Sequence, residues 1–580
     1  MPVYPGMISK GSGSDMELFH SKVKTFQNGE VLDRFKEFSH SSLDFIVLVT
    51  GALSESPQEI KNILEECARV LKSGGLLFVQ GPPYFLAEYG VLLDKYLKFK
   101  YWIALESSIQ KITHGLPSAH KGLLLFVKGE KFNIGKVRLP HQMCKACQHT
   151  LRDWGGKSHL MHPDGYVISD VWKTLSNENK PNNISNEFLT LIERLVLSCK
   201  SDKKVDIKGI MAPLEGIRVQ PVGNICESQD TIYQPLLSNL FVPPVTEAED
   251  NNNSYNHNDL ADNKIILGDA IEVLKTIPSN SIDLVFADPP YNLDKSYTRY
   301  NDELEISEYI QWCNSWLDEY IRILKPTGSL FVLNLPHWAM YHAAYLNKKL
   351  YFQNWIVWEA MSEPRGKLMP AHYALLFYTK QPVGFTFNYE KIKTLDARHY
   401  CLRSACVKKR KLLSDRDQEL MTDIWWNVNR IKHKKDRDYH PCQLPSSLME
   451  RIIRLTTNPG DIIVDALAGT GTTAISARQL GRKYIAIDLD PNYIEIMKEK
   501  LQQLETHGYL VRAATVKPKN GISKKELQLE LRRLAIDLGR LPTEDDVRRF
   551  SKVDLEMYKS VFPTWGKALK AAKLEGVNGY

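Results

Sequence analysis

The sequence has few cysteines and no long apolar run. Its nine cysteines among 580 residues are too few for the disulfide scaffold on which small secreted domains depend. No stretch approaches the roughly 20 apolar residues that a membrane-spanning helix requires, and the first residues lack the basic-then-apolar order of a secretory signal. We therefore expect a protein of the reducing cytoplasm with no membrane partner.

Charge and length set only broad limits. The 75 Lys and Arg residues against 68 Asp and Glu residues leave a formal net charge of +7, which permits a polyanionic partner but does not require one. A chain of 580 residues is several times longer than a usual single domain, so we expect two or three domains with large cores.

Two parts of the chain are related copies. SLDFIVLVTGA from Ser42 matches SIDLVFADPPY from Ser281, and the run that starts at Val70 matches the run that starts at Ile323, with nearly the same spacing. Shorter matches follow in the same order, such as LPSAHKGLLLFVKG with MPAHYALLFYTK and SDVW with TDIW. This order indicates an internal duplication, in which the second copy is fuller.

The duplication predicts four segments. They are a degenerate copy over residues 16–235, a linker over 236–263, a catalytic copy over 264–515 and a small helical domain over 516–580. The linker is rich in Asn and Asp and poor in residues that could build a core. The second copy alternates β-rich apolar runs with longer amphipathic segments, which predicts a mostly parallel sheet covered by helices, with ligands at the carboxyl ends of its strands.

The first candidate site is the motif Asp288-Pro289-Pro290-Tyr291, directly after the apolar run IDLVFA. An exocyclic base amine is a poor nucleophile because its lone pair is delocalised into the ring. A carboxylate such as Asp288, helped by the carbonyl of Pro289, can accept its N–H bonds and stabilise the positive charge that develops when it attacks an electrophile. The prolines stiffen the backbone, and Tyr291 offers a face for an unstacked base. An ordinary Asp-Pro turn is the alternative.

The second candidate site is the glycine-rich turn from Asp465 to Thr473, between the apolar run DIIV and the helical AISARQLG. Closely spaced glycines let a ligand approach the backbone, and the next strand ends in acids about 20 residues further on, which places Asp488 for ribose hydroxyls. Taken alone, this turn would fit nucleotide phosphates equally well.

Together the two sites resemble the β group of DNA amino-methyltransferases, in which the DPPY motif precedes the glycine motif. The resemblance covers residues 264 to about 505 and includes Gly268-Asp269, DPPYN, LKPTGSLFV, HPCQLP from His440, the glycine turn and the acid strand. It implies an α/β, Rossmann-like S-adenosyl-L-methionine-dependent methyltransferase fold that is internally duplicated and followed by a small all-α C-terminal domain.

The resemblance also assigns the site residues. The implied catalytic residues are Asp288, Pro289, Pro290 and Tyr291. The residues implied to bind S-adenosyl-L-methionine are Asp269, His440, Gln443, Pro445, Asp465, Leu467, Gly469, Gly471, Thr472 and Asp488. Leu467 replaces an aromatic residue that is usual in the family, and Asp488 is shorter than the usual Glu, so we expect weaker cofactor binding.

The function implied by this resemblance is methylation of adenine N6 in double-stranded DNA. A restriction-modification setting is usual for the family, so a cognate restriction endonuclease is a candidate partner. Asp288 at the start of the motif favours adenine over cytosine. N4-cytosine methylation and a DNA-binding protein without turnover are the alternatives.

The first copy lacks both sites. Val49-Thr50-Gly51-Ala52 stands where DPPY lies in the second copy, and GPPY from Gly81 aligns with NLPH from Asn334, which predicts a structural loop. KGIMAPLEG takes the place of the glycine turn, which predicts neither a strand-turn-helix nor a bound cofactor. We expect this copy to occupy the place of a partner subunit, so that the chain is a monomer with an internal pseudo-dimer, or a dimer. A folded relic is the alternative.

Cysteine and histidine residues gather in each copy. They are His141, Cys144, Cys147, His149, His159 and His162 in the first copy, and His399, Cys401 and Cys406 in the second. Such clusters suggest zinc. However, the copies do not share the spacing, and no second CxxC follows at a zinc-ribbon distance. We therefore predict partly buried thiols and no metal.

Further DNA contacts are expected in two regions. The basic runs VKKRKLL and RIKHKKDR between residues 381 and 438, with Arg365, could follow phosphates, although a solvated charged face is the alternative. The C-terminal segment resembles the helical repeats attached to homing endonucleases, in LGR from Leu538 and WGKAL from Trp565. Its expected core residues are Phe550, Tyr558, Phe562, Trp565 and Leu569.

Overall fold

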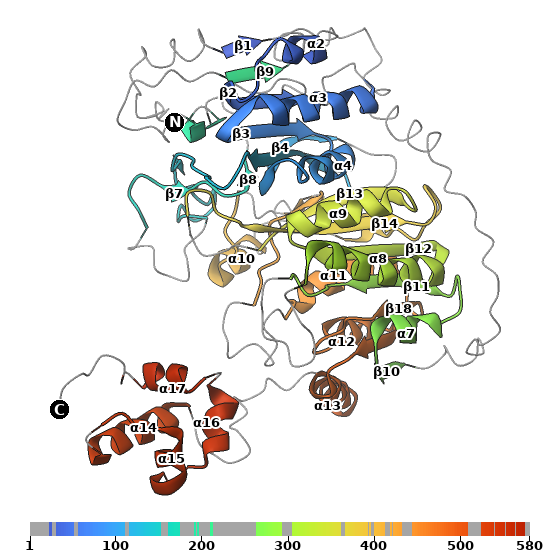
Figure 1. Ribbon diagram of the computed structural model, residues 1–580. Coiled ribbons are helices and arrows are strands. Elements are labelled where there is room, and N and C mark those ends of the chain that lie inside the picture. Colours follow the sequence, from blue (N-terminus) through green and yellow to red (C-terminus); the bar gives the residue numbers. More distant parts are fainter. Residues whose placement is uncertain are drawn as a thin grey trace. The chain divides into compact units, whose positions relative to one another are not determined.

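The computed structural model (Figure 1) describes most of the two copies and the C-terminal segment. The described residues are 31–50, 56–110, 115–151, 161–173, 263–292, 304–360, 366–392, 399–411, 421–431, 443–507 and 524–574 without 539, 552, 563 and 573, together with the short segments 23–25, 191–192, 194–196, 209–212, 394–395 and 418–419.

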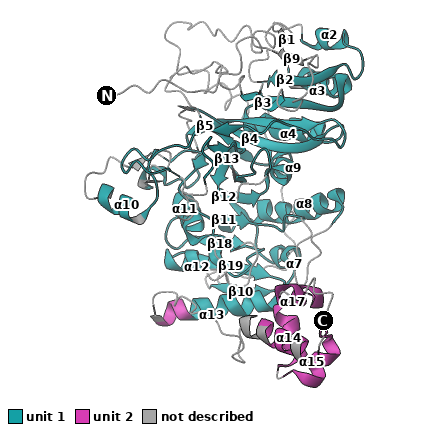
Figure 2. Cartoon of the chain, turned by 90° about the vertical axis from the view of Figure 1, so that its left-hand side faces the viewer, with its two compact units in different colours: residues 1–502 teal, residues 503–580 magenta. Residues whose placement is uncertain are grey.

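The chain divides into two compact units, residues 1–502 and residues 503–580 (Figure 2). The first unit contains both copies of the duplication. Among the described helices, none combines the length and the apolar character that crossing a membrane would need.

The second copy is built on an eight-stranded sheet. Its order is β10 (Lys264–Leu267), β19 (Lys483–Asp488), β18 (Ile462–Asp465), β11 (Ile282–Ala287), β12 (Leu324–Asn334), β14 (His372–Thr379), β13 (Tyr351–Glu359) and β17 (Ile424–Trp425). All neighbouring pairs are parallel except the two that β14 makes with β12 and β13. The predicted mostly parallel sheet is therefore confirmed.

Helices cover both faces of this sheet (Figure 1). They are α7 (Ala270–Lys275), α8 (Ile306–Ile323) and α9 (Pro336–Leu346) on one face, and α11 (Ser446–Thr456), α12 (Thr472–Gln479) and α13 (Pro491–His507) on the other. Along β11, Val285 and Ala287 pack with the first group, whereas Leu284 and Phe286 pack with the second. Successive side chains of a strand point to opposite faces, so a strand covered on both sides is apolar throughout.

The first copy repeats this architecture, with one strand fewer among its described residues. Its sheet runs β1 (Val23–Thr25), β9 (Gly209–Ala212), β2 (Leu43–Val49), β3 (Leu71–Gly81), β5 (Ser118–Val127), β4 (Lys98–Gln110) and β8 (Val171–Trp172), with helices α2 (Val31–Lys36), α3 (Pro57–Val70) and α4 (Pro83–Leu93). Each copy also has an ion pair at the equivalent position. Lys72 lies 2.9 Å from Asp44 in the first copy, and Lys325 lies 2.8 Å from Asp283 in the second.

One expectation about the first copy needs correction. The GPPY segment is not a loop, because Gly81 ends β3 and Pro83 begins α4. Residues Gly209–Ala212 form a strand parallel to β2, where β18 lies beside β11 in the second copy. The residues that follow this strand lie outside the described part of the chain, so the expectation that the first copy has no strand-turn-helix there stays a prediction.

The two copies pair through reciprocal contacts. The Nδ1 atom of His120 lies 3.0 Å from a carboxylate oxygen of Asp423, and that of His372 lies 3.0 Å from Asp170. These four side chains are all buried. His120 and His372 occupy matching positions of the repeat, as do Asp170 and Asp423. A contact of residue i with j, repeated as j with i, is the signature of two-fold symmetry.

Apolar packing across the same boundary follows this symmetry. The indole rings of Trp102 and Trp355, which are equivalent in the repeat, stack with centroids 3.7 Å apart and planes 4° from parallel. Buried residues of α4 and α9 belong to one continuous hydrophobic cluster that includes both copies. The two halves therefore share a core in the way that two subunits of a dimer do.

The C-terminal unit is a small helical domain. It contains α14 (Lys524–Leu538), α15 (Glu544–Phe550), α16 (Leu555–Val561) and α17 (Trp565–Ala571). Tyr558 and Phe562 are buried in its core, and Trp565 packs against them. The prediction for Phe550 was wrong, because its side chain is 55% exposed. Phe550 is the last residue of α15, so the core is closed by Val547 and by Leu555 of the next helix instead.

Candidate active site

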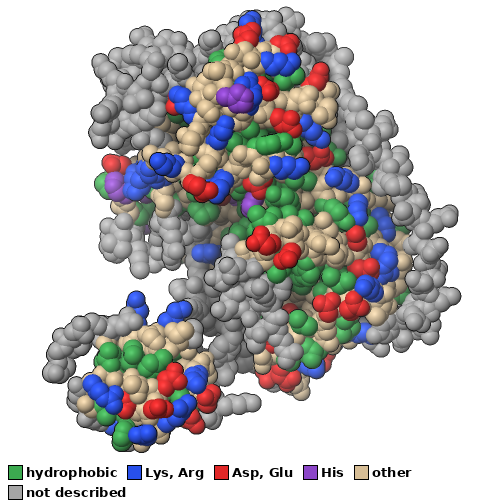
Figure 3. All heavy atoms as spheres, viewed as in Figure 1, with side chains coloured by type: hydrophobic (Ala, Val, Ile, Leu, Met, Phe, Trp, Pro, Cys, Tyr) green, Lys and Arg blue, Asp and Glu red, His purple; other side chains and the backbone are tan. Residues whose placement is uncertain are grey.

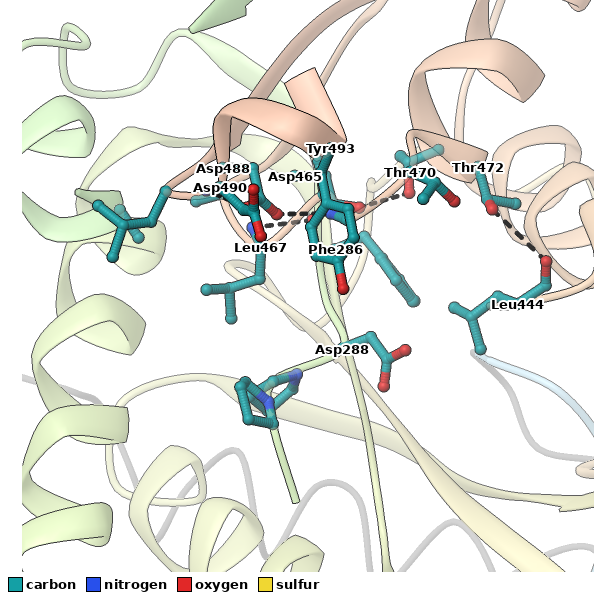
Figure 4. Close-up of a pocket in the computed structure, with 18 of the residues that line it drawn as sticks. Phe286, Asp288, Leu444, Asp465, Leu467, Thr470, Thr472, Asp488, Asp490 and Tyr493 are labelled. Atoms are coloured by element: carbon teal, nitrogen blue, oxygen red, sulfur yellow. Dashed lines mark hydrogen bonds between the residues drawn. The ribbon is translucent and has the colours of Figure 1, made fainter. Parts of the chain in front are cut away.

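A pocket lies where β10, β19, β18 and β11 end, at the carboxyl edge that the parallel sheet predicts. Figure 4 shows Asp288 on one side of this pocket and Asp465 and Asp488 on the other. The residues predicted from the sequence that line it are Asp269, Asp288, Pro289, Pro290, Tyr291, Gln443, Asp465, Leu467, Gly469, Thr472 and Asp488. The structure thus brings together two motifs that are separated by more than half of the second copy.

Three predicted cofactor residues are not among the lining residues. His440 lies outside the described residues. Pro445 is the residue before α11, next to Gln443 and Leu444, which do line the pocket. Gly471 is the N-cap of α12 with a φ of 83°, and a Cβ at this position would meet the side chain of Met497. Glycine is therefore required there for the shape of the turn.

The carboxylate of Asp465 organises the glycine turn. It accepts hydrogen bonds from the Thr473 hydroxyl at 2.5 Å and from the backbone N–H of Leu467 at 3.1 Å. Only 4% of the residue is exposed, and burial raises the pKa of this carboxyl to about 7, despite the hydrogen bond from Thr473. A carboxyl group with such a pKa would become fully ionised on binding a cation.

Asp488, at the end of β19, connects this strand to the same turn by hydrogen bonds. Its carboxylate accepts hydrogen bonds from the backbone N–H groups of Gly469 and Asp490, both at 2.8 Å. Its backbone carbonyl accepts from the N–H of Gly268 at 3.0 Å. Burial raises the pKa of the Asp488 carboxyl to about 6. The acid at the end of β19 therefore holds both the glycine turn and the start of the Gly268-Asp269 segment.

Asp269 has a structural role besides its position in the pocket. One of its carboxylate oxygens caps α7 by accepting hydrogen bonds from the N–H groups of Ile271 at 2.9 Å and Glu272 at 3.1 Å. An ionised carboxylate has about four acceptor positions, so capping is compatible with a contact to a ligand hydroxyl.

The charge of the pocket discriminates between ligands. Its described lining residues include five carboxylates and neither Lys nor Arg: Asp269, Asp288, Asp465, Asp488 and Asp490. Such a pocket repels phosphate groups, because like charges in a partly buried site interact strongly. It suits a ligand that has a positive charge and several hydroxyl or amino donors. The nucleotide-phosphate alternative for the glycine turn is therefore disfavoured, and S-adenosyl-L-methionine, which is cationic and has hydroxyl and amino donors, fits these acceptors.

The DPPY motif is held by hydrogen bonds from three aromatic side chains. The Tyr291 hydroxyl donates to the Asp288 carboxylate at 2.8 Å, the Tyr309 hydroxyl donates to the Pro290 carbonyl at 2.7 Å, and the Trp338 indole N–H donates to the Tyr291 carbonyl at 2.7 Å. Tyr291 itself is buried. In this conformation its ring packs inside the protein and its hydroxyl orients Asp288, so its stacking role stays a prediction.

Tyr320 of α8 was not predicted and connects the two motifs. Its hydroxyl donates to the carbonyl of Phe286 at 2.9 Å and accepts from the N–H of Ala466 at 2.8 Å. The Phe286 carbonyl lies near the end of β11, just before the DPPY motif, and the Ala466 N–H lies directly after β18, within the glycine turn. The aromatic residues of α8 recur at helical spacing, which in the sequence indicates only a core-facing helix.

Further pocket residues were also missed. They include Phe286, Trp312, Leu444, Asp490 and Tyr493. Figure 4 shows the hydroxyl of Tyr493 pointing toward the side of the pocket on which Asp288 lies. Tyr493 is in the first turn of α13, where the sequence shows an amphipathic helix and no motif.

Only part of the predicted DNA-contacting segment is described. Lys408 and Lys409 are exposed on α10 (Ser404–Lys411). Arg365 and most of RIKHKKDR lie outside the described residues. The phosphate contacts assigned to these runs stay predictions.

Comparison with known families identifies the family of the chain. The family model described as "DNA methylase" matches residues 53–205 and 282–499, one part in each copy. The chain belongs to the DNA methylase family. A second model, the homing endonuclease associated repeat, matches residues 522–575, so the resemblance of the C-terminal unit is confirmed as well.

Individual relatives match part of the chain at moderate identity. The type II methyltransferase M.BamHI of Bacillus amyloliquefaciens is 37% identical over 242 residues, which are 41% of this chain and 57% of that protein. The DNA adenine methyltransferase YhdJ of Escherichia coli (strain K12) is 30% identical over 271 residues, 46% of this chain and 91% of that protein. Among solved structures, PvuII DNA methyltransferase (cytosine-N4-specific) aligns over 40% of this DNA methylase and 84% of that chain, at 20% identity and a TM-score of 0.31.

Membership of this family establishes the fold class and the cofactor expected from the sequence. The fold is the α/β fold of S-adenosyl-L-methionine-dependent DNA methyltransferases, and the C-terminal unit is helical. The chain is thus a DNA methyltransferase, and the described residues that line its pocket all belong to the second copy.

Proposed function

We propose that this DNA methyltransferase transfers a methyl group from S-adenosyl-L-methionine to the N6 atom of adenine in duplex DNA. The supporting observation is that Asp288 and the turn from Asp465 to Thr472 line one pocket. In the proposed division of the chain, residues 264–515 carry the reaction, residues 16–235 form the degenerate copy, and residues 516–580 add a DNA-binding module.

The roles of the residues follow from their positions. Bound S-adenosyl-L-methionine supplies an electrophilic methyl group. Asp465 and Asp488, whose ionised forms suit a cationic ligand, would bind its polar groups beside Leu467. The Asp288 carboxylate and the Pro289 carbonyl would accept hydrogen bonds from the target amino group, turn its lone pair out of the plane of the ring and stabilise the developing positive charge. The Tyr291 hydroxyl keeps Asp288 in place.

The target base would have to leave the DNA helix. The Asp288 carboxylate lies at the edge of a pocket in the protein, which an amino group cannot reach while its base is stacked in a duplex, so the base must be flipped out.

Adenine is favoured over cytosine by two observations. The catalytic motif begins with Asp288, and YhdJ, which aligns over most of its length, is named a DNA adenine methyltransferase. The order of the motifs, with Asp288 before Asp465, supports the β group. N4-cytosine methylation on the same residues is the second candidate, and DNA binding without turnover is a candidate of another class.

The setting proposed for this reaction is restriction-modification. M.BamHI is named a type II methyltransferase, and such an enzyme would protect DNA from a cognate restriction endonuclease in the cytoplasm. We propose that the chain acts as a monomer, because the reciprocal pairing of His120 with Asp423 and His372 with Asp170 already fills the surface that a second subunit would use.

Mass spectrometry of nucleosides tests the reaction. DNA of varied sequence is incubated with the full chain and S-adenosyl-L-methionine, in parallel with the Asp288→Ala variant. We expect N6-methyladenine from the native chain and none from the variant. N4-methylcytosine would keep the mechanism and change the base, whereas the absence of any methylated base would support the DNA-binding alternative.

A further inference from the structure

Four cysteines from the two copies meet in one cluster that the proposed reaction does not use. Cys144 and Cys147 belong to the first copy, and Cys401 and Cys406 belong to the second. Each offers one sulfur atom, and all four sulfur atoms lie within 4.8 Å of one another. Cys144, Cys401 and Cys406 are buried, and Cys147 is partly buried.

The sulfur distances match a tetrahedral metal site. The Sγ atoms of Cys144 and Cys406 are 3.9 Å apart, and those of Cys147 and Cys401 are 3.6 Å apart. Four thiolates around zinc at the usual bond length of about 2.3 Å would be separated by about 3.8 Å. A disulfide bond of about 2.0 Å is much shorter than either distance.

The backbone around the first two cysteines forms a tight turn. Met143 and Thr150 pair as an antiparallel bridge, and between them the N–H of Gln148 donates to the Cys144 carbonyl at 2.9 Å. Gln148 has a φ of 57°, a left-handed conformation that few non-glycine residues adopt. This turn brings two thiols separated by two residues to the same side.

The second pair of cysteines is fixed against this turn. The N–H of Cys401 donates to the Cys144 sulfur at 3.3 Å, and the N–H of Lys145 donates to the carbonyl of His399 at 3.0 Å. Cys406 lies in the first turn of α10. The two pairs therefore have spacings of CxxC and Cx4C, both within the range found in zinc sites.

Hydrogen bonds and charge around the cluster also suit thiolates. The buried guanidinium of Arg410 donates to the Cys401 carbonyl at 3.0 Å and approaches the Cys406 sulfur at 3.5 Å. Four thiolates around one divalent cation have a net negative charge, and the positive charge of Arg410 reduces it. Groups that orient the ligands in this way are a regular part of metal sites.

We propose that Cys144, Cys147, Cys401 and Cys406 bind one structural zinc ion that joins the two copies of this DNA methyltransferase. Four protein thiolates complete the tetrahedral shell, so the site has no open position for catalysis. Zinc is favoured over calcium or magnesium because soft thiolates select it, although tetrahedral sulfur sites also hold iron.

The site would fix two basic segments relative to each other. Figure 3 shows Lys, Arg and His side chains gathered at the edge where β7 (Tyr166–Val167) lies in Figure 1. Lys136 and Lys145 are exposed in the segment before it, and Lys408 and Lys409 are exposed on α10. A metal ion between these segments would hold both of them in place without using an exposed side chain.

Metal analysis of the full chain tests the proposal. The chain is purified without chelators, its zinc and iron are measured by mass spectrometry, and its zinc is examined by X-ray absorption. We expect about one zinc per chain, with four sulfur neighbours at about 2.3 Å. Iron in place of zinc, or zinc with nitrogen and oxygen neighbours, would overturn the assignment.

Variants separate this site from adventitious zinc. Cys147→Ser and Cys401→Ser, one in each copy, are expected to reduce the zinc content from one per chain to nearly zero. Cys67→Ala is the matched control, because Cys67 is a buried free cysteine outside the cluster, and it should keep one zinc.

A titration covers the case in which these variants fail to fold. Native chain stripped of metal receives cobalt(II) chloride, and sulfur-to-cobalt charge-transfer absorption should rise to a plateau at one equivalent and be displaced by zinc chloride. No charge-transfer band, or four cysteines isolated as two disulfides after purification under reducing conditions, would contradict the proposal. None of these measurements depends on methyltransferase activity.

Discussion

The two copies of this chain have equivalent residues at their boundary but differ at the ends of their strands. At their boundary, equivalent residues are retained on both sides: Trp102 stacks on Trp355, and each copy supplies one His and one Asp to the reciprocal pairs. At the strand ends, only the second copy has the DPPY motif and the glycine turn. The duplication has thus preserved pairing in both halves and the proposed reaction site in one.

Physical reasons explain this difference. A buried boundary requires complementary groups on both sides, because an unpaired buried charge is costly. A reaction site in one copy does not require a site in the other. Val49 can therefore stand where Asp288 lies in the second copy, at the end of a strand whose register with its neighbour is otherwise the same.

The largest expected effect is on the reaction itself. Asp288→Ala should reduce the rate of DNA methylation by about a thousandfold, because the target amine loses its acceptor, while cofactor affinity stays within about twofold. Val49→Ala at the equivalent position of the first copy is the matched control, and its rate should be unchanged at temperatures where it is folded. Radiolabelled methyl transfer measures the rates. A similar loss in both variants would mean that both copies contribute to the reaction.

The next effect concerns the boundary between the copies. Asp423→Ala leaves His120 and the N–H of Ala119 buried without this carboxylate, so the free energy of unfolding should fall by about 3–5 kcal/mol. Asp170→Ala should cost a similar amount through His372 and Ala371. Unfolding in urea, followed by tryptophan fluorescence, measures both.

An exposed ion pair provides the control for these variants. Asp33 lies 3.0 Å from Lys36 on α2 with both side chains largely exposed, so Asp33→Ala should change the free energy of unfolding by less than about 1 kcal/mol. If Asp170→Ala were as mild as Asp33→Ala while Asp423→Ala were severe, the boundary would not be energetically two-fold.

A smaller effect is expected on cofactor binding as a function of pH. Burial raises the pKa values of Asp465 to about 7 and Asp488 to about 6, so lowering the pH from 8 to 5.5 protonates nearly all of Asp465 and most of Asp488. A cationic ligand prefers the ionised forms, so its affinity should fall by at least about tenfold over this range, with protons released on binding at the lower pH. Calorimetry in buffers of different ionisation enthalpy measures both quantities.

Variants show whether the pH dependence of cofactor affinity comes from these carboxylates. Asp488→Asn keeps an oxygen that can accept from Gly469 but loses the charge, so its affinity at pH 8 should be about 10- to 100-fold lower and its pH dependence weaker. Glu272→Gln, in the exposed first turn of α7, should behave as the native chain. An affinity independent of pH would show that neither carboxylate binds the cationic part of the ligand.

The smallest expected effect is on cofactor affinity and concerns position 467, where this chain differs from the usual family residue. Leu467→Phe restores the aromatic residue that is usual at this position, and should raise the affinity for S-adenosyl-L-methionine by about two- to tenfold, because an aromatic contact contributes about 0.5–1.5 kcal/mol. Leu467→Ala should lower it. Unchanged affinity in both variants would place Leu467 away from the bound cofactor.

The sequence by itself determined the features that short contiguous segments encode. The DPPY motif, the glycine turn and the acid at the end of β19 each have their chemistry within a few residues, and the repeat is visible because its order and spacing persist. The alternation of apolar runs with amphipathic segments was enough to predict the parallel sheet, and therefore the edge at which the site lies.

Only the tertiary structure decided the contacts between segments distant in the chain. Tyr320 connects the two motifs from the last turn of α8, and the sulfur atom of Cys147 lies 3.6 Å from that of Cys401, which is 254 positions away in the sequence. The spacing of cysteines within each copy argued against zinc, because each copy contributes only one half of the cluster. Local periodicity records which face of an element is buried, but not which partner covers it, so the shared core and the four-cysteine cluster became visible only when the two copies were folded together.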